Sequence, residues 1–573
     1  MELRARWLGR VPYAEALDLQ RGLFANAADD YLLLLEHPHT YTLGVRANAA
    51  NVLIDPSSVG AELYRVDRGG DVTYHGPGQL VGYPILHVAG HRGGGMADTV
   101  AYVRSVEQLV IDVLADLGLP GAGRLDRHPG VWIDPDGPRP RKIAAVGVRL
   151  TRGRSMHGFA LNVEPDLAMF GHIVPCGISD KGVTSLAAEG VVAPLCGVVD
   201  AVVARAAALW GGGEVDRADV VWRRPADDRD LSPFSRGAGV GQPVRRAAVA
   251  AEGPIHPAQA TDGTSVRLLG RLAEAGVAGG VAIAERKPDW MRAKVRLGGD
   301  VARTRHTIRD LDLVTVCEEA GCPNLSECWS EGTATFMLCG ERCTRACGFC
   351  LVDTRHPESL DQGEPERVAQ AVAAMGLDYT VLTMVARDDL PDGGAAHVAA
   401  TVQAIRGLCP GTRVEVLISD LAGSADSLAV VLAAGPDVVN HNVETVARLQ
   451  RAVRPSAGYA RSLALLARVK AAGFVAKSGI IVGMGETFDE VTDTLADLSA
   501  VGVDIVTIGQ YLRPTTHHLP VSRWWTPEDF DHWARIGEDR FGIARVESSP
   551  LTRSSHHAAA AHDAAMREIV GTH

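Results

Sequence analysis

The stretch CEEAGCPNLSECWSEGTATFMLCGERCTRACGFC, residues 317–350, carries most of the cysteines of this 573-residue chain. Disulfides are the ordinary explanation for clustered cysteines, but 10 cysteines in so long a chain, without an apolar leader at Met1–Arg6, predict an intracellular, cytoplasmic protein whose thiols stay reduced. A closed structural zinc site takes four protein ligands. Iron–sulfur clusters explain groups of three better, because an iron can keep a position for another ligand. The two groups are Cys317-x4-Cys322-x5-Cys328 and Cys343-x3-Cys347-x2-Cys350.

The second triplet resembles the motif of the radical SAM enzymes, in which three cysteines hold a [4Fe–4S] cluster and one iron binds S-adenosylmethionine (SAM). The first triplet resembles the auxiliary-cluster motif of one such family, lipoyl synthase. That family is also matched by Arg387–Leu390, Asp392–Gly394, His441–Thr445, Gln510–Pro514 and Arg553–Ser555. The resemblance implies SAM and two [4Fe–4S] clusters, with the ligands Cys343, Cys347 and Cys350 in one and Cys317, Cys322, Cys328 and Ser555 in the other. It implies that sulfur is inserted at C6 and C8 of a protein-bound octanoyl chain.

Two positions depart from the lipoyl synthase pattern. His556 stands where the family usually has Tyr, and Cys339 stands where it usually has an aliphatic residue. We assign no role to His556, and we expect Cys339 to be an apolar filler. Gly483–Glu486 resembles a glycine-rich strand end that contacts SAM, although the match is short. A purely structural cluster, without SAM chemistry, is the alternative.

Strand-like and helical segments alternate in the C-terminal part of the chain, which predicts parallel β–α–β units with a site at the carboxyl ends of the strands. The resemblance implies a partial (β/α)6 barrel over residues 262–573. From their positions near strand ends we assign Asn442, Glu444, Lys477 and Arg513 to cofactor binding. The expected strands are Thr380–Val385, Val414–Ile418, Asp437–Asn440, Val475–Val482 and Asp504–Ile508, with helices at His397–Leu408 and Asp489–Ala500.

The N-terminal part of the chain predicts a separate, mixed α/β domain over residues 1–225. Val100–Leu117 has the periodicity of an amphipathic helix, and Leu80–Val88 and Lys142–Leu150 are typical of strands. Residues 226–261 contain turn-forming residues without hydrophobic periodicity, so we expect a flexible tether there. The chain is therefore predicted to be a fusion of two unlike α/β domains.

Three features of the N-terminal domain carry chemistry only in combination. Arg68–Gln79 is a glycine-rich stretch, Lys142 begins an otherwise apolar strand, and Cys176 lies in a Pro-Cys-Gly turn. Taken singly, a plain loop, a solvent-facing lysine and an inert cysteine are equally good or better explanations. A nearby ammonium group favours the thiolate of a cysteine, so Lys142 and Cys176 together form a plausible nucleophilic pair.

Together these segments, with Lys142–Ala144, His157–Val163 and Pro175–Ile178, resemble the octanoyltransferase family of lipoate biosynthesis, which is related in fold to lipoate and biotin ligases. The resemblance covers roughly residues 6–225. It implies that Cys176 is the nucleophile that carries octanoate as a thioester and that Lys142 is its acid–base partner. The implied acyl pocket consists of Arg68, Gly69, Gly70, Asp71, Val72, Thr73, Tyr74, His75, Ala145, Val146, Gly147, Gly158, Phe159 and Ala160.

Two alternatives to the octanoyltransferase remain for this half. A lipoate or biotin ligase uses ATP and a lysine but needs no cysteine nucleophile, so Cys176 favours the transferase. A non-catalytic module that binds lipoyl domains for the synthase would need neither Cys176 nor Lys142.

Composition and the two resemblances predict a bifunctional enzyme of protein lipoylation. The formal net charge of −12 argues against a nucleic-acid partner, and no apolar run is long enough to span a membrane. The expected partners are octanoyl-acyl carrier protein, an electron donor, and lipoyl domains such as glycine-cleavage H protein or a 2-oxoacid dehydrogenase subunit. The order of the two reactions gives the tether a rationale, because the product of the first site is the substrate of the second.

Overall fold

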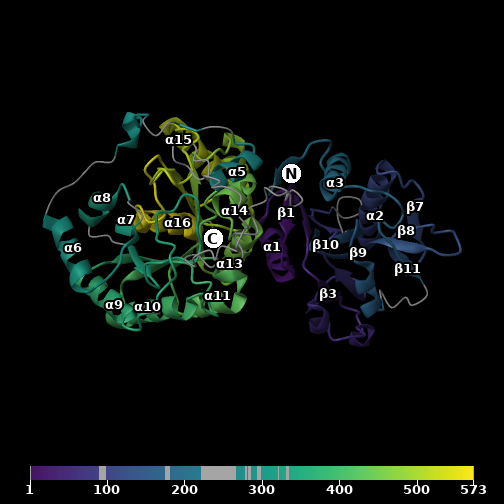
Figure 1. The fold of residues 1–573 in the computed structure, drawn as a ribbon, viewed down its shortest axis with the longest axis horizontal. Helices are drawn as coiled ribbons and strands as arrows, with labels where there is room; N and C mark the ends of the chain where they lie inside the picture. The colour runs from purple at the N-terminus through teal and green to yellow at the C-terminus, as the bar shows by residue number, and fades with distance from the viewer. Residues whose placement is uncertain are drawn as a thin grey trace, which may run out of the picture. The chain divides into compact units, whose positions relative to one another are not determined.

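The computed structural model describes residues 2–88, 98–174, 181–220, 266–277, 280–281, 285–292, 299–319, 322–330 and 335–571. The chain divides into two compact α/β units, residues 1–222 and 223–573 (Figure 1). The tether predicted at 226–261 lies outside the described residues. None of the helices in the described ranges combines the length and hydropathy of a membrane-spanning segment.

The N-terminal unit is built on a nine-stranded mixed sheet, counted over its described residues. Its main strand order is β12-β1-β2-β6-β10-β9-β8-β7, and β11 pairs with β9. The pairs from β2 to β7 along this order are antiparallel, whereas β12, β1 and β2 are mutually parallel. The bounds are β1 Leu3–Arg10, β2 Asp30–Glu36, β6 Gln79–Ile85, β7 Ala122–Leu125, β8 His128–Ile133, β9 Arg141–Thr151, β10 Arg154–Asn162, β11 Gly182–Val183 and β12 Asp216–Asp219.

Helices and a second, smaller sheet complete this unit. Helices α2 (Thr99–Asp116) and α3 (Leu195–Trp210) pack with the main sheet into one hydrophobic core, and α1 (Tyr13–Asn26) contacts β6 and β10. The small sheet has the order β4-β3-β5, with the bounds β3 Thr40–Leu43, β4 Glu62–Arg65 and β5 Val72–His75. The predicted helix and both predicted strands of this half are confirmed to within a few residues, as α2, β6 and β9.

The C-terminal unit contains a seven-stranded sheet in which every neighbouring pair is parallel and strand order follows chain order from β13 to β19. Six crossovers link these seven strands. The expected partial (β/α)6 barrel has six strands, and β19 is one strand more. The predicted strands are confirmed within a few residues. The bounds are β13 Thr335–Leu338, β14 Tyr379–Met384, β15 Arg413–Leu417, β16 Val438–Asn440, β17 Val475–Val482, β18 Ile505–Gln510 and β19 Arg545–Ser548.

Helices alternate with these strands along the chain and cover the outer side of the sheet (Figure 1). The last helix, α16 (Ala558–Gly571), packs instead against residues at the strand starts, among them Tyr379 and Ile505. The crossover helices are α9 Glu364–Met375, α10 Ala395–Leu408, α11 Ala425–Ala433, α12 Gln450–Val453, α13 Tyr459–Ala471, α14 Phe488–Ala500 and α15 Pro527–Arg535. Before the sheet come α5 Val266–Glu274, α6 Gly299–Asp310, α7 Val316–Glu319 and α8 Leu325–Ser330.

Candidate active sites

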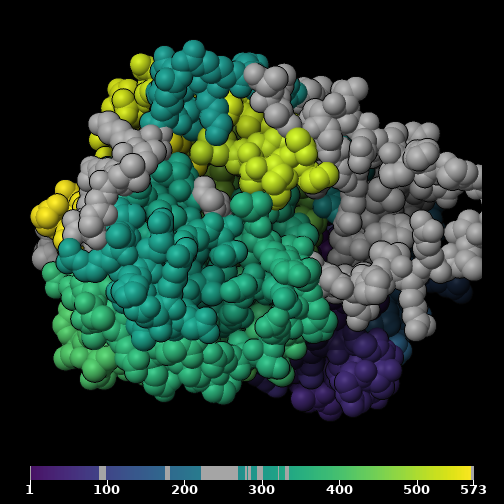
Figure 2. Space-filling view, turned by 60° about the vertical axis from the view of Figure 1, so that its left-hand side comes forward, coloured from purple at the N-terminus to yellow at the C-terminus, as the bar shows by residue number. Residues whose placement is uncertain are grey.

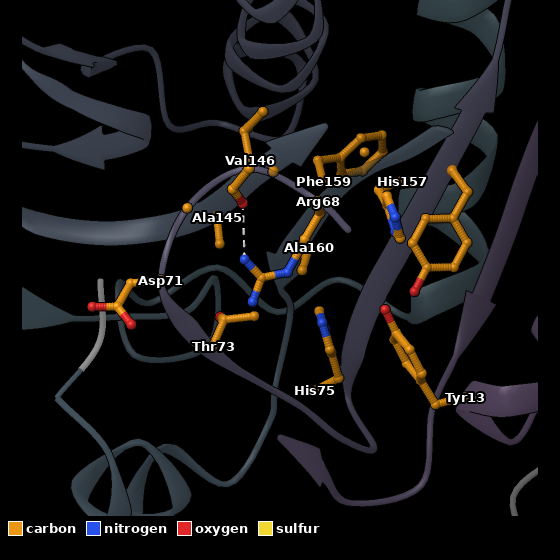
Figure 3. Close-up of a pocket in the computed structure, with 15 residues that line it drawn as sticks. Tyr13, Arg68, Asp71, Thr73, His75, Ala145, Val146, His157, Phe159 and Ala160 are labelled. Atoms are coloured by element: carbon orange, nitrogen blue, oxygen red, sulfur yellow. Dashed lines mark hydrogen bonds between the residues drawn. The ribbon is translucent and has the colours of Figure 1, made fainter. Parts of the chain in front are cut away.

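A pocket in the N-terminal unit is lined by residues of β5, β9 and β10 and of the loop that leads into β5 (Figure 3). The register between β9 and β10 brings distant stretches together, since Ala145 pairs with Ala160 and Gly147 with Gly158. The lining contains twelve of the fourteen residues that the sequence assigned to the acyl pocket. They are Arg68, Gly69, Gly70, Asp71, Thr73, His75, Ala145, Val146, Gly147, Gly158, Phe159 and Ala160.

The other two assigned residues, Val72 and Tyr74, belong to a hydrophobic cluster instead. Successive side chains of a strand point to opposite faces, so Thr73 and His75 of β5 line the pocket while Val72 and Tyr74 face away from it. The Tyr74 ring packs edge-on against Phe170, with the ring centres 5.2 Å apart. The contacts of these two residues are those of core residues.

Lys142 is the second residue of β9 and is 8% exposed. The register between β8 and β9 shifts beside it, so that β9 carries an extra residue, Ile143. Such bulges re-aim side chains. Ile143 packs in the core, and strand alternation turns Lys142 to the opposite face. The Lys142 ammonium lies 4.7 Å from the centre of the Trp132 ring, within cation–π range.

Cys176 belongs to residues 175–180, which lie outside the described residues. The chain on both sides of this segment is placed. The Val174 amide donates to the Asn51 carbonyl at 2.8 Å, and Val183 of β11 pairs in register with Lys142. The chain therefore passes Lys142 seven residues after Cys176.

Arg68 places a buried positive charge in this pocket. Its guanidinium donates to the Thr42 carbonyl at 2.7 Å and to the Gly69 carbonyl at 2.9 Å. Burial, followed by the charges of His37 and Arg68, lowers the pKa of His75 well below its usual value. Burial also lowers the pKa of His157, against the opposing effect of Asp67. At neutral pH the pocket thus holds one permanent cation and neutral imidazoles.

Three pocket residues were missed by the sequence assignment: Tyr13, Tyr83 and His157. Tyr13 opens α1 and Tyr83 lies in β6, so neither is close in sequence to the motifs. His157 precedes Gly158 directly and was quoted within a motif, but it was not assigned to the pocket. Its backbone φ is +59°, a left-handed conformation that the sequence does not signal.

In the C-terminal unit, the second cysteine triplet lies in the loop between β13 and α9, at the carboxyl end of the sheet. Burial raises the pKa of the Cys347 thiol to about 11 and that of the Cys350 thiol to about 12. The neighbouring cysteine and Glu444 raise the pKa of each thiol further, and the Arg454 charge opposes the shift at Cys347. As they stand, no three His, Cys, Asp or Glu side chains among the described residues are grouped closely enough to hold a metal ion. The donor set nevertheless suits an iron–sulfur cluster, because cysteine thiolates are the usual ligands of such clusters and metal binding deprotonates the thiols.

Arg345, inside this cysteine motif, fastens the loop to the ends of two strands. Its guanidinium contacts Asp388 after β14 at 2.7 Å and Asp420 after β15 at 2.6 Å. Asp420 is fully buried, and the Arg345 charge holds its pKa at about 2 despite that burial. Thr344 adds a hydrogen bond from its hydroxyl to the Ala386 carbonyl at 2.9 Å. The loop is therefore fixed by protein contacts.

Asn442 and Glu444, which follow β16, face this region. The Asn442 amide donates to Glu444 at 3.1 Å, and Glu444 has a φ of +64°. Asn442 Oδ1 and Glu444 Oε2 are buried without a hydrogen-bond partner among the described residues. Because unpaired buried polar atoms are costly, they indicate a place for a polar ligand beside Cys347 and Cys350.

The remaining two assigned cofactor residues lie in different places. Arg513 donates to the His518 carbonyl at 3.1 Å, and the His518 ring is 2.9 Å from the Cys350 carbonyl oxygen, so Arg513 lies beside the cysteine loop. Lys477 lies near the start of β17 and forms a fully buried ion pair with Glu415 at 2.8 Å. Lys477 therefore does not lie at the carboxyl ends of the strands. Its ion-pair partner is Glu415.

The first triplet and the C-terminal motif meet in space although more than two hundred residues separate them. The Asn324 side chain, two residues after Cys322, donates to the Leu551 carbonyl at 2.7 Å. Burial raises the pKa of the Cys322 thiol, and the nearby Arg553 charge opposes this shift. Asn442 also donates to the Ser554 hydroxyl at 2.8 Å, which joins this region to the second triplet. Teal and yellow surfaces of this unit adjoin in Figure 2.

The two residues that depart from the family pattern, His556 and Cys339, lie in different surroundings. The His556 ring lies 3.9 Å from the Glu327 carboxylate, which neighbours Cys328 in α8. Cys339 is buried at the end of β13 in the hydrophobic core, and burial raises the pKa of its thiol. Its amide donates to Glu364 at 2.9 Å, and His397 binds the same Glu364 oxygen at 2.6 Å. Cys339 is therefore a core residue, as expected.

Comparison with known protein families divides the chain in the same way. The family model for the lipoyl protein ligase A/B catalytic domain matches residues 12–206. The model for the N-terminal domain of lipoyl synthase of the radical SAM family matches residues 277–322, and that of the radical SAM superfamily matches residues 337–498.

Curated relatives match the C-terminal half closely. A lipoyl synthase of Rubrobacter xylanophilus is 50% identical over 287 residues, which are 50% of this chain and 89% of the relative. The C-terminal half belongs to the lipoyl synthase family. A lipoyl synthase of Mycobacterium tuberculosis is 52% identical over 274 residues, 48% of this chain and 88% of the relative. The family implies SAM and [4Fe–4S] chemistry for this half, and the N-terminal half carries a lipoyl protein ligase A/B catalytic domain.

Solved structures are more distant. A bipartite lipoate protein ligase from Thermoplasma acidophilum, described together with its E2 lipoyl domain, is 20% identical with a TM-score of 0.32, over 38% of this chain and 86% of that chain. A methylornithine synthase structure is 14% identical with a TM-score of 0.31, over 42% of this chain and 70% of that chain.

Proposed function

We propose that the N-terminal half, residues 1–225, transfers an octanoyl group from octanoyl-acyl carrier protein to a lysine of a lipoyl domain. Cys176 attacks the donor thioester and carries the acyl group as a new thioester, and the lysine amine of the acceptor then displaces it. Lys142 gives a proton to the departing carrier thiol and takes one from the incoming amine. The pocket lined by β5, β9, β10 and the loop before β5 holds the acyl chain.

The observation that carries this proposal is the pocket itself. Twelve residues from three separate stretches line one pocket, and β9, which supplies three of them, also carries Lys142. The bulge at Ile143 separates Lys142 from the core residues Ile143 and Ala144, and the Lys142 ammonium lies over the Trp132 ring. The glycines at 69, 147 and 158 allow the backbone to approach a chain lying in the pocket.

For the C-terminal half, a lipoyl synthase, we propose a specific set of ligands. Cys343, Cys347 and Cys350 would hold the [4Fe–4S] cluster that binds SAM. When bound, the cluster would supply the electron for SAM cleavage, and SAM would supply the radical that removes hydrogen at C6 and C8. Asn442, Glu444 and Arg513 bind SAM through their side chains. The unpaired oxygens of Asn442 and Glu444, beside these thiols, support this assignment. Lys477 is left out because Glu415 binds it.

We further propose that Cys317, Cys322, Cys328 and Ser555 hold a second [4Fe–4S] cluster, whose sulfides are the sulfur substrate. The support is the packing of the C-terminal motif against Asn324 and Cys322. A serine oxygen is a weaker partner for iron than a thiolate, so it suits a cluster that must be dismantled. Unchanged sulfur insertion by Ser555→Cys would contradict this role of Ser555.

The tether at 226–261 and the domain boundaries on either side of it are part of the proposal. A flexible linker keeps the second site near the octanoylated lipoyl domain, at an effective concentration on the order of millimolar. Lipoyl domains are the acceptors of both reactions, and an electron donor serves the second.

Acyl-enzyme trapping tests the first half. The full chain is incubated with octanoyl-acyl carrier protein without acceptor, and peptide mass spectrometry should find octanoate on Cys176. A parallel incubation with free octanoate and ATP tests the ligase alternative: acceptor labelling there, with no acyl-Cys176, would replace the transferase by a ligase. Iron and sulfide content after anaerobic reconstitution, in the parent and in Cys322→Ala and Cys347→Ala, tests the two ligand sets.

A further inference from the structure

The residues that line the pocket in the N-terminal unit include successive residues of β9 and β10. Ala145 pairs with Ala160 at the end nearer to Lys142, and His157 pairs with Val148 at the other end. These two rungs are three residues apart, which is roughly 10 Å at about 3.3 Å per residue. An extended eight-carbon acyl chain has seven carbon–carbon bonds of about 1.2 Å projected length each, or roughly 9 Å. The pocket is therefore about as long as an octanoyl chain.

The end away from Lys142 is closed by rings that hold one another in place. Figure 3 shows Tyr13, His75 and His157 together, on the side opposite Ala145 and Asp71. Tyr13 stacks on His75 with the ring centres 6.0 Å apart. Behind them, the His37 ring is 2.7 Å from the Tyr83 hydroxyl. Burial is nearly complete for these residues, so a longer chain could not enter without moving several rings.

His157 is the most constrained member of this wall. Its Nε2 lies 2.8 Å from Asp67 Oδ1, its backbone amide donates to Gln20 Oε1 at 2.9 Å, and its side chain is 1% exposed. Its φ of +59° is a conformation that L-residues other than glycine avoid, and burial in a strand does not require it. From this strained backbone position the His157 side chain lines the pocket.

We propose that His157, together with Tyr13 and His75, is the residue group that sets acyl chain length in this pocket and limits it to eight carbons. The proposal rests on the acyl transfer proposed above. It assigns to His157 a role in substrate specificity, since its ring meets the methyl end of the chain and lies roughly 20 Å along the strands from Lys142. The eight-carbon limit matters to the second half, because C6 and C8 are the carbons that receive sulfur.

Chain-length competition tests the proposal. The full chain receives equal hexanoyl-, octanoyl-, decanoyl- and dodecanoyl-acyl carrier protein together with an apo lipoyl domain, and mass spectrometry gives the ratio of products. His157→Gly suits the positive φ and removes the wall, so the decanoyl-to-octanoyl ratio should rise at least about tenfold, as for a methylene in an apolar pocket. Gly147→Ala should shift the preference toward hexanoyl, because its added Cβ would lie 3.1 Å from Arg68 Cδ within the pocket.

The matched control is Arg152→Gly. Arg152 has a φ of +53° in the turn between β9 and β10 and does not line this pocket, so its change relieves the same backbone conformation and should leave all product ratios as in the parent. Unchanged ratios in both His157→Gly and Gly147→Ala, with transfer still active, would overturn the proposal. If His157→Gly does not fold, the Gly147→Ala ratio decides.

A parent chain that transfers no acyl group would refute the proposed function and not the pocket length. Binding of free C6, C8, C10 and C12 fatty acids to the full chain, by calorimetry, then tests the wall directly. Tightest binding at C8 in the parent and at C10 or C12 in His157→Gly supports the proposal. Affinity that rises steadily to C12 in the parent contradicts it.

Discussion

The pocket of the N-terminal unit and the cysteine-lined end of the C-terminal unit are assembled in opposite ways. The pocket is built on strands, and the register between β9 and β10 decides which residues face it. The cysteine sites are built on loops beyond the strand ends, and buried ion pairs and side-chain hydrogen bonds hold these loops to the sheet. An acyl chain needs shape, whereas clusters and SAM need ligand atoms that converge from distant parts of the chain.

The largest expected effect is the selective loss of one of the two activities when a cysteine of one site is replaced. Cys347→Ala should abolish SAM cleavage and sulfur insertion while octanoyl transfer continues at the parent rate, because the two sites share no residues. Cys176→Ser should do the reverse and leave sulfur insertion into a pre-octanoylated lipoyl domain intact. Intact mass of the lipoyl domain reports both. Loss of both activities in either variant would break the comparison, since it would make the two sites interdependent.

Lys142→Ala tests the strand-built site alone. A positioned acid–base group contributes about 10²–10⁴-fold, so transfer should fall by that factor, and SAM cleavage should not change. Lys142→Arg keeps the charge beside Trp132 but cannot exchange protons near neutral pH, and it should be as slow as the alanine variant. The measurement is the single-turnover rate of octanoyl transfer. A Lys142→Arg variant at the parent rate would reduce the role of Lys142 to electrostatics.

Asp420→Asn tests the loop-built site. It leaves the buried Arg345 with Asp388 as its remaining carboxylate partner, and we expect the free energy of unfolding to fall by about 1–3 kcal/mol. Iron uptake on reconstitution should fall with it, because the cysteine loop loses its attachment to β15. Thermal unfolding and iron content measure the two effects. Asp361→Asn, which removes an exposed ion pair with Arg367, is the control and should change neither.

The smallest expected effect is a pH dependence of the free energy of unfolding, which arises from His37 beside the pocket. Burial lowers the pKa of His37 to about 4 from 6.5, so the unfolded chain binds a proton that the folded chain does not. Stability is then full above pH 6.5 and falls as pH decreases toward 4, by about 2 kcal/mol between pH 7 and 5. His37→Gln removes this proton linkage, so urea unfolding of the variant at pH 7 and 5 should show a smaller difference than the parent. An equal difference would exclude His37 as a source of acid sensitivity.

Sequence sufficed where the information was local. Alternation of apolar residues predicted the strands and helices of both halves, and the resemblance to the octanoyltransferase family grouped most of the pocket. It failed where non-local contacts decide. Val72 and Tyr74 belong to a contiguous motif but face away from the pocket, while Tyr13 and Tyr83 line it from α1 and β6.

Two further positions show why such contacts escape sequence reasoning. Lys477 lies near the start of β17, and its charge is satisfied by Glu415 on β15, two strands away in the sheet. His157 adopts a positive φ that no residue type announces. Neither the pairing of two buried charges nor the strain at one backbone position can be derived from spacing.

The most direct test of a two-step enzyme in one chain is the intact mass of an apo lipoyl domain after anaerobic incubation with the reconstituted full chain, octanoyl-acyl carrier protein, SAM and a reductant. We expect the lipoyl mass, and we expect only the octanoyl mass when SAM is omitted. An unmodified lipoyl domain in the complete mixture, together with sulfur insertion when the domain is supplied already octanoylated, would contradict the account, because the N-terminal half would then not be a transferase.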